Sequence, residues 1–397
     1  METLTPLYLK KGEERRIKAG HLWVFSNEVD TAKSSLKQLT PGQPVAILTG
    51  RGEFIANGYV NPNSLICARV VSRKPGHQFG PDLIRTRIQA ALDLRQTLFG
   101  EPYYRMVFSE GDYLPGCIVD RFGSIASVQL TTAAMESQRE AVVDTLASID
   151  GIDAVLLKND ASGRNFEGLP LYVETAFGNV PEETKVHESG ATFTVPLHQG
   201  QKTGWFYDMR LNRQRLARLA KDKSVLDVFS YAGGVGILAA QAGATEAVCV
   251  DASAKALDYA ARSAEKSGVG DKVDTMQGDV YDVFQQLRED DRTFDIVSVD
   301  PPAFIKGKKD KKKGEQAYAR VNREAMKLVR DGGLLMSCSC SQHMLADDLR
   351  KALGKAATQR RVRLQILEQG HQGPDHPVHP AMPETNYLKM FLTRMMK

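Results

Sequence analysis

Four apolar stretches in the second half of the chain each end in an aspartate, and this pattern constrains the fold more than any other feature. The stretches cover residues 224–227, 246–251, 273–279 and 294–300, and they end in Asp227, Asp251, Asp279 and Asp300. Taken singly, each acid is explained more simply as the cap of a following helix. Four in succession predict a parallel sheet whose strands all present a carboxylate at the ligand-binding edge.

A glycine-rich turn follows the first of these strands. Its glycines, Gly233, Gly234 and Gly236, allow the backbone to approach a ligand closely. Their spacing differs from the G-x-G-x-x-G dinucleotide pattern, and the strand ends in Asp227 rather than in a turn that would seat a pyrophosphate. The sequence therefore favours a neutral or cationic ligand and disfavours a dehydrogenase that uses NAD.

An acid six residues ahead of a glycine pair resembles the first motif of the S-adenosylmethionine (SAM) methyltransferases. The resemblance implies a class I, Rossmann-like α/β fold with SAM as cofactor. It implies that Asp227 faces the amino-acid part of SAM or an ordering water, and that Asp279 binds adenine. Asp251, roughly 20 residues past the turn, is placed to accept hydrogen bonds from both ribose hydroxyls. Further cofactor contacts are expected at Phe229, Ser230, Tyr231, Gly233 and Asp300.

A polar and aromatic loop over residues 199–213 precedes the first strand of the sheet. It resembles the extra cofactor motif of the same family, which implies that Lys202 and Thr203 bind SAM. The alternative is that Asp208 and Arg210 begin the next helix and pair with each other. The two explanations are compatible.

Length and composition exclude several classes of protein. The chain of 397 residues allows two or three domains, and its apolar runs are shorter than the ~18 residues of a membrane-spanning helix. Five scattered cysteines indicate neither disulfides nor a zinc site. His371, His376 and His379 lie in a proline-rich loop without regular ligand spacing. We therefore expect a cytoplasmic protein with no membrane segment, signal peptide or metal.

Residues 1–75 contain short β-type segments divided by frequent turn signals, which predicts a small barrel or sandwich. The run Gly-His-Leu-Trp-Val-Phe at residues 20–25 resembles the PUA domain, a small RNA-binding barrel. Trp23 and Phe25 are explained better as core residues than as RNA contacts. The net charge of +4 does not by itself imply nucleic acid.

Residues 76–185 predict an α+β linking domain, and residues 186–397 a methyltransferase domain. In a helix expected over residues 81–99, Ile84, Ile88 and Leu92 recur on one face, while Arg95 is expected on another. Short strands and a second helix follow, and these elements are segregated rather than strictly alternating.

A basic segment over residues 303–313 follows the fourth strand and is expected to be a flexible loop, with a helix beginning near residue 318. Such charge runs are usually solvated. Because this one emerges at the edge that carries the acids, contact with the phosphates of a nucleic acid is an equal alternative.

A fifth strand, expected over residues 332–341, closes on two cysteines. Cys338, inside the strand, is expected to be a small buried hydrophobe. Cys340 lies past the strand end between Ser339 and Ser341, where a thiolate nucleophile can be reached. Methylation of carbon 5 of a pyrimidine needs such a thiolate, because that carbon is a poor nucleophile until a group adds at carbon 6.

The order of the domains, together with Asp-Pro-Pro at 300–302, Ser-Cys-Ser at 339–341 and Asp-His-Pro at 375–377, resembles the RlmI-type methyltransferases. These enzymes modify carbon 5 of a cytosine in large-subunit ribosomal RNA. The resemblance covers essentially the whole chain. It implies Cys340 as the nucleophile, Asp300 as the group that holds the base, and large-subunit ribosomal RNA, free or partly assembled, as the partner. A homodimer is left open.

One departure and two alternatives accompany this interpretation. Some related enzymes carry a second cysteine after the proline of the fourth strand, where this chain has Ala303, so another base must remove the carbon-5 proton. Nitrogen-directed RNA or protein methyltransferases also use an Asp-Pro-Pro turn, but they favour an aromatic residue at the position of Ala303. A non-catalytic RNA-binding ribosome assembly factor is the second alternative, and it would transfer no methyl group.

Overall fold

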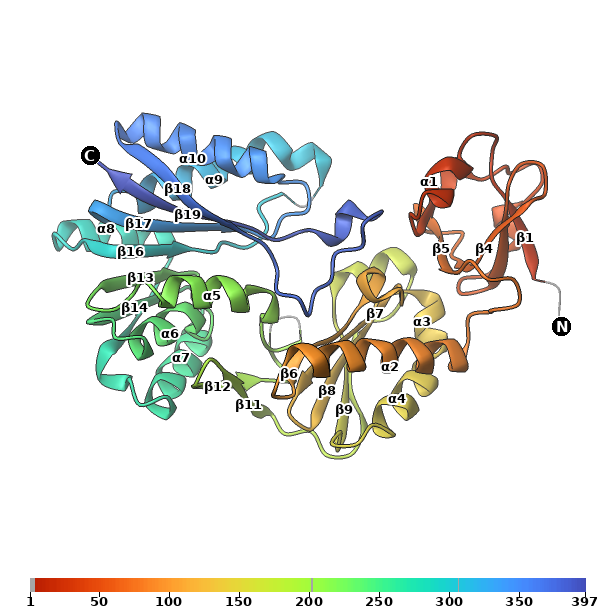
Figure 1. Cartoon of the computed structure of the whole chain (residues 1–397), viewed down its shortest axis with the longest axis horizontal. Coiled ribbons are helices and arrows are strands. Elements are labelled where there is room, and N and C mark those ends of the chain that lie inside the picture. Colours follow the sequence, from red (N-terminus) through yellow and green to blue (C-terminus); the bar gives the residue numbers. More distant parts are fainter. Residues whose placement is uncertain (1–3, 201–202, 306) are drawn as a thin grey trace. The chain divides into compact units, whose positions relative to one another are not determined.

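The computed structural model describes residues 4–200, 203–305 and 307–397. The chain forms two compact units. The first contains residues 1–184, 196–205 and 374–385, and the second contains residues 185–195, 206–373 and 386–397. Each unit therefore combines segments from distant parts of the chain, which the sequence colours of Figure 1 make visible.

A five-stranded sheet forms the amino-terminal part of the first unit, in the order β1-β3-β4-β5-β2. Its strands are β1 (Thr5–Tyr8), β2 (Trp23–Phe25), β3 (Pro44–Leu48), β4 (Phe54–Val60) and β5 (Ile66–Ser72), and the short helix α1 (Glu14–Lys18) follows β1. β1 and β3 are parallel, and the other neighbours are antiparallel. Val24 and Ile47 belong to its apolar core, and Trp23 packs against that core. The indole Nε1 of Trp23 also donates to Glu110 at 2.8 Å.

A second sheet in the first unit has the order β10-β9-β8-β7-β6. Its strands are β6 (Tyr103–Phe108), β7 (Cys117–Phe122), β8 (Ile125–Leu130), β9 (Ala154–Asn159) and β10 (Tyr172–Phe177), accompanied by helices α2 (Pro81–Leu98), α3 (Ala133–Ser137) and α4 (Arg139–Ala147). Strands β8 and β9 are parallel, and the other neighbours are antiparallel. Ile84, Ile88 and Leu92 of α2 are buried in this part of the core, as their helical spacing predicts.

Arg95 of α2 departs from the sequence prediction, because its side chain is fully buried rather than placed on an outer face. It follows Leu92 by three residues and therefore lies on the same side of the helix. Its guanidinium pairs with both carboxylate oxygens of Asp112, at 2.6 and 2.7 Å. A buried charge is tolerated when it is paired and hydrogen-bonded, and an apolar pattern along one helix cannot reveal a partner outside that helix.

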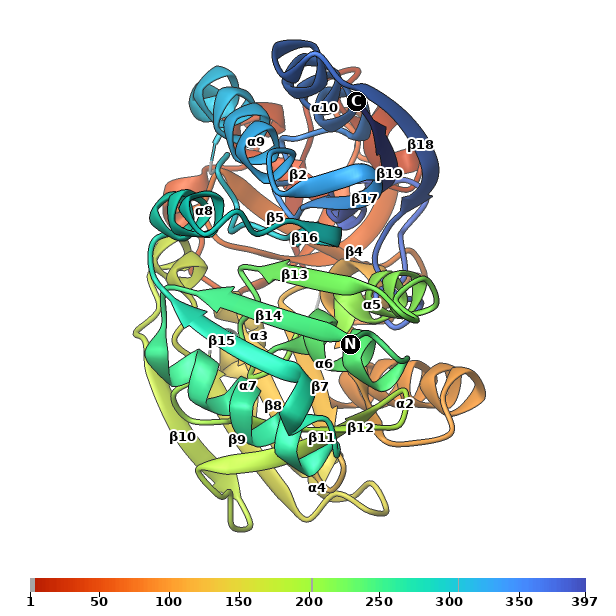
Figure 2. The same cartoon turned by 90° about the vertical axis from the view of Figure 1, so that its left-hand side faces the viewer.

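A seven-stranded sheet is the framework of the second unit, in the order β15-β14-β13-β16-β17-β19-β18 (Figure 2). Its strands are β13 (Ser224–Val228), β14 (Glu246–Asp251), β15 (Val273–Gln277), β16 (Phe294–Val299), β17 (Val329–Ser339), β18 (Arg363–Gly370) and β19 (Lys389–Met396). The strands from β15 to β17 run parallel to one another, and β19 is antiparallel to both of its neighbours. The predicted Rossmann-like α/β fold is confirmed.

Helices cover both faces of this sheet (Figure 1). On one face lie α8 (Val280–Glu289), α9 (Lys311–Ala325) and α10 (Ala346–Arg360), and on the other lie α5 (Arg210–Ala217), α6 (Gly234–Gln241) and α7 (Ala254–Lys266). On the α8 side, Phe284, Tyr318 and Leu353 belong to one apolar core with Val248 and Val297 of the strands. A hairpin of β11 (Glu183–Glu188) and β12 (Ala191–Pro196) precedes α5.

The basic segment before α9 differs from the prediction of a flexible loop that reaches residue 313. Helix α9 begins at Lys311, so residues 311–313 form its first turn, and residues 308–310 form a short 3-10 turn before it. Lysine is a good helix former. The ammonium of Lys311 lies 2.7 Å from the carboxylate of Asp348 on α10, and this pairing offsets the unfavourable position of a cation at a helix amino terminus.

Candidate functional site

The carboxyl ends of neighbouring parallel strands carry the four acids that the sequence pattern singled out. Asp227 is the fourth of the five residues of β13, and Asp251 is the last residue of β14. Asp279 follows β15, and Asp300 follows β16. Strand β13 is in register with both β14 and β16 at Val228. The sheet therefore places these carboxylates along one edge.

Asp227 is buried beneath the glycine-rich turn. Its Oδ2 accepts a hydrogen bond of 3.1 Å from the backbone N–H of Gly236, and burial raises its pKa to about 7. A Cβ on Gly236 would lie 2.5 Å from the Sγ of Cys249. The close packing of α6 on the sheet therefore requires glycine at this position.

Two residues of the turn, Phe229 and Tyr231, have positive φ angles of 63° and 49°. Such a conformation costs a non-glycine residue on the order of 1–3 kcal/mol and persists where the surroundings enforce it. The N–H of Tyr231 donates to Oδ2 of Asp251 at 3.0 Å, and the N–H of Ser230 donates to the carbonyl of Val250 at 3.0 Å. The turn is thus fastened to the end of β14, and strain of this kind clusters in ligand-binding segments.

Asp251 is held by two backbone donors. Its Oδ1 accepts from the N–H of Ser253 at 2.9 Å, and its Oδ2 accepts from Tyr231. Because an ionised carboxylate offers about four acceptor positions, the two oxygens also have capacity for ribose hydroxyls.

Asp279 is exposed and caps helix α8, with its Oδ1 accepting from the N–H of Tyr281 at 2.9 Å. The capping explanation therefore holds for this acid, and its contact with adenine stays a prediction. Asp300 continues from β16 and is partly buried, and its backbone N–H donates to the carbonyl of Val228 at 3.3 Å.

The two cysteines near the end of the fifth parallel strand differ in burial. Cys338 lies within β17 and is fully buried, and this burial raises its pKa well above the usual range of a thiol. Cys340 follows the strand and is partly exposed, whereas the other four cysteines are buried. Val299, the last residue of β16, is in register with Ser337. Cys340 is three residues after Ser337 and therefore lies beyond the end of β16.

Lys389 is a residue of this region that the sequence interpretation missed. It opens β19 opposite Ser339 of β17. Its side chain is largely buried, and Nζ donates to the backbone carbonyls of Ser341 and Tyr387, both at 2.6 Å. Burial lowers the pKa of Lys389 to about 8. The available sequence signal was a single lysine inside the apolar run of residues 388–392.

The polar loop before α5 is divided between the two units. Lys202 lies outside the described residues. Thr203 belongs to the first unit, where its side chain is buried and its hydroxyl donates to Asp120. The cofactor roles of Lys202 and Thr203 stay predictions.

Residues 206–213 of that loop belong to the second unit. Arg210 is the first residue of α5, which agrees with the expectation that a helix begins there. The carboxylate of Asp208 accepts from the hydroxyl of Tyr387 at 2.6 Å, and Arg210 lies 3.8 Å from Glu188. These contacts connect the start of α5 to the segment just before β19 and to the β11–β12 hairpin.

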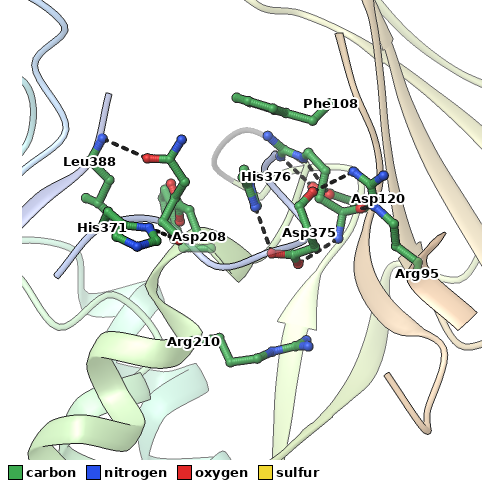
Figure 3. Close-up of polar contacts among 12 residues, drawn as sticks. Arg95, Phe108, Asp120, Asp208, Arg210, His371, Asp375, His376 and Leu388 are labelled. Atoms are coloured by element: carbon green, nitrogen blue, oxygen red, sulfur yellow. Dashed lines mark hydrogen bonds and ion pairs between the residues drawn. The ribbon is translucent and has the colours of Figure 1, made fainter. Parts of the chain in front are cut away.

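Asp375 and His376 belong to the first unit, where Nδ1 of His376 lies 2.9 Å from Oδ1 of Asp375 (Figure 3). The Oδ2 of Asp375 accepts from the backbone N–H of Arg105 at 3.1 Å, and its carbonyl accepts from Arg95 at 2.7 Å. These residues fasten segment 374–385 to α2 and β6. Within residues 4–200, 203–305 and 307–397, no cluster of three or more His, Cys, Asp or Glu could hold a metal ion.

None of the described helices combines the length and the apolar character needed to cross a bilayer.

Two family models match the chain. The model of a PUA-like domain matches residues 7–73, and the model of an S-adenosylmethionine-dependent methyltransferase matches residues 172–391. A ribosomal RNA large subunit methyltransferase I from Erwinia tasmaniensis is 34% identical over 394 residues, which cover 98% of this chain and 99% of the relative. The chain belongs to the ribosomal RNA large subunit methyltransferase I family. The predicted resemblance and the cofactor SAM are thereby confirmed for this methyltransferase.

Further relatives also match nearly the whole length of this methyltransferase. A protein of the same name from Escherichia coli O157:H7 is 33% identical over 397 residues, covering 98% of this chain and 99% of the relative. A provisionally assigned SAM-dependent methyltransferase from Streptococcus mutans has the same fold, with a TM-score of 0.83 at 20% identity over 98% of this chain and 100% of that chain. A similar structure, with a TM-score of 0.85 at 21% identity over 98% and 100%, was solved with S-adenosylhomocysteine.

Proposed function

We propose that this methyltransferase methylates carbon 5 of a cytosine in large-subunit ribosomal RNA through a covalent adduct at Cys340. The observation that carries the proposal is the position of Cys340, the partly exposed cysteine among five, directly after β17 on the edge that carries Asp227, Asp251 and Asp300. The relatives' names support ribosomal RNA as the substrate, and the PUA-like domain supports RNA as its chemical class.

The cofactor fits the second unit through its own residues. The buried carboxyl of Asp227, the strained turn at 229–231 and the glycine contact at Gly236 form a compact support at the end of β13. We propose Asp227, Phe229, Ser230, Tyr231 and Gly233 around the amino-acid part of SAM, with Asp251 at the ribose and Asp279 at the adenine. When bound, SAM supplies the methyl group that carbon 5 takes up.

The thiolate of Cys340 performs the activating step. Its sulfur forms a bond to carbon 6, and the electron pair of the 5,6 double bond moves to carbon 5, which becomes nucleophilic. After methylation, the carbon-5 proton passes to a base or a water molecule. The 5,6 double bond then re-forms, and the sulfur–carbon bond breaks to return the thiolate.

Asp300 is proposed to hold the edge of the target base. It follows β16 and is partly buried, and the neighbouring Pro301 is buried, so its backbone is well fixed. A base inside a stacked or paired RNA is inaccessible to a cysteine at a strand end, and we therefore propose that the target cytosine is turned out of its stack.

The sequence-based domain limits, residues 1–75, 76–185 and 186–397, are retained as proposals for the RNA-binding, linking and methyltransferase parts. Free or partly assembled large-subunit RNA is the proposed partner. A cytoplasmic location is proposed, because the five free cysteines fit a reducing compartment.

Methyl transfer from labelled SAM to ribosomal RNA from a strain lacking the gene tests the function. Mass mapping of the modified nucleoside should find methyl at carbon 5 of one cytosine. Methyl on an exocyclic nitrogen would favour the nitrogen-directed alternative, which Ala303 makes less suitable because that position carries no aromatic ring. No transfer to any form of the RNA would favour an assembly factor.

A further inference from the structure

Lys389 places a buried ammonium at the end of β17, next to the loop that begins with Cys340. The antiparallel pairing of Ser339 with Lys389 sets this position, and the two hydrogen bonds of Nζ, to the carbonyls of Ser341 and Tyr387, fix the side chain. Only 7% of the residue is exposed. Burial of a lysine inside a strand pair is costly unless its charge serves a partner.

Cys340 is an electrostatic partner of this ammonium. Desolvation lowers the pKa of Lys389 to about 8. The negative charges of Cys340 and of the Asp348 carboxylate oppose this effect and raise the pKa of Lys389. With that pKa, most Lys389 side chains still carry their proton at neutral pH. A cation beside a cysteine favours the thiolate over the thiol.

We propose that Lys389 is a positioning residue that holds Cys340 in its thiolate form, both before the sulfur attacks and when it departs. The thiol proton passes to water, and Lys389 keeps its own proton throughout. When the sulfur–carbon bond later breaks, the electron pair returns to a sulfur whose negative charge the same ammonium stabilises. The use of this thiolate on cytosine rests on the proposed function, whereas the pairing of Lys389 with Cys340 does not.

Among the described residues, polar groups on three further elements lie near the pair. Asp348 on α10 faces Lys389 and is itself paired with Lys311. Tyr318 on α9 lies 2.9 Å from the Oγ of Ser341, and burial raises its pKa, so its phenol is neutral over the working range. The negative charge of Asp300, after β16, raises the pKa of the neighbouring Cys338. Of the groups named here, Lys389 is the one that carries a positive charge beside Cys340.

Alkylation of the native protein by iodoacetamide tests the pair without RNA or SAM. Cys340 should react selectively, because the other four cysteines are buried, and peptide mass analysis identifies the modified residue. In the wild type, the pH midpoint of the alkylation rate should lie below the ~8.5 of an ordinary thiol. In Lys389→Met it should rise by about one pH unit or more, because the neighbouring cation is lost. Lys389→Arg should retain most of the effect.

Tyr318→Phe is the matched control, because it removes a hydrogen bond at Ser341 while keeping the ammonium. Its midpoint should equal that of the wild type, even if both variants unfold at lower urea concentrations. An unchanged midpoint in Lys389→Met would overturn the inference. If that variant does not fold, a wild-type midpoint at or above the ordinary thiol value would overturn it equally.

The same set of proteins separates this inference from the proposed function. In one outcome, the alkylation midpoint depends on Lys389, but Cys340→Ser still transfers methyl groups at the full rate. This result would support the pairing of Lys389 with Cys340 and reject its proposed role in catalysis. A loss of transfer in Cys340→Ser combined with a midpoint independent of Lys389 would keep the proposed function and reject the pair.

Discussion

Arg95 donates a hydrogen bond of 2.7 Å to the backbone carbonyl of Asp375, a residue 280 positions later in the chain. Within the first unit this contact joins helix α2 to segment 374–385 (Figure 3). The same guanidinium is paired with Asp112 and is fully buried. The fold of the first unit is therefore completed by residues from near the carboxyl terminus.

Replacement of Arg95 by Met should lower the free energy of unfolding by about 3–5 kcal/mol, because it leaves the carboxylate of Asp112 without its cation. Urea denaturation monitored by fluorescence measures the change. Arg85→Met on the same helix is the matched control, since Arg85 and its partner Asp82 are exposed, and it should change stability by less than about 0.5 kcal/mol. Equal effects of the two substitutions would contradict the role given to Arg95.

Asp227 should make stability depend on pH. Its pKa rises from 3.8 to about 7 on folding, so the folded chain holds this proton more tightly than the unfolded chain. The resulting stabilisation is complete below the pKa that Asp227 has in the unfolded chain. It is lost as the pH rises through about 7, the pKa in the folded chain. Asp227→Asn keeps an acceptor for Gly236 but has no proton to lose. Its free energy of unfolding, relative to that of the wild type, should therefore increase from pH 5 to pH 8 by an amount on the order of 1–4 kcal/mol. Urea unfolding at both pH values without cofactor measures it, and a constant difference would reject the assignment.

Asp251→Ala should weaken SAM binding by on the order of 1–3 kcal/mol, because the ribose hydroxyls lose their acceptor and the turn loses its contact through Tyr231. Calorimetric titration measures the affinity. RNA binding should stay nearly intact. Asp258→Ala, at an exposed position on α7, is the control and should bind SAM normally. An unchanged affinity in Asp251→Ala would remove this acid from the cofactor site.

The exposed lysines before and within the first turn of α9 should contribute to RNA binding through released counterions. Replacing Lys308, Lys309, Lys312 and Lys313 by Gln should reduce the slope of log affinity against log salt by roughly 0.7–0.9 for each lost phosphate contact. Lys311→Gln is the contrasting variant, because Lys311 is paired with Asp348, and it should change stability more than the salt slope. If the four substitutions leave the salt slope unchanged, these lysines are simply solvated and do not contact phosphates.

Much of the second unit could be predicted from the sequence because its pattern is local. An apolar strand, a terminal acid and a glycine-rich turn are neighbours in the chain, and parallel pairing then brings Asp227, Asp251 and Asp300 to one edge. The same locality identified Cys340, since a cysteine just past a strand end differs from one within it. These positions follow from strand periodicity and chain order.

What the sequence did not predict depends on partners that are distant in the chain. Arg95 looked exposed because its partners, Asp112 and the carbonyl of Asp375, lie outside its helix. Lys389 looked like one residue of an apolar strand, because the carbonyl of Ser341 comes from a different strand end. Helix α9 begins before the expected position because Asp348 accepts the charge of its first turn.

Trapping at Cys340 tests the central claim most directly. With RNA that carries 5-fluorocytosine at the target position, the wild type should form a protein–RNA adduct that resists denaturant, since fluorine cannot leave as a proton does. Cys338→Ser should still be trapped and lose mainly stability, because it places a hydroxyl in a fully buried position. Cys340→Ser should form no adduct and lose nearly all methyl transfer while keeping SAM affinity. A Cys340→Ser protein that methylates at the wild-type rate would contradict both the nucleophile and the carbon-5 chemistry.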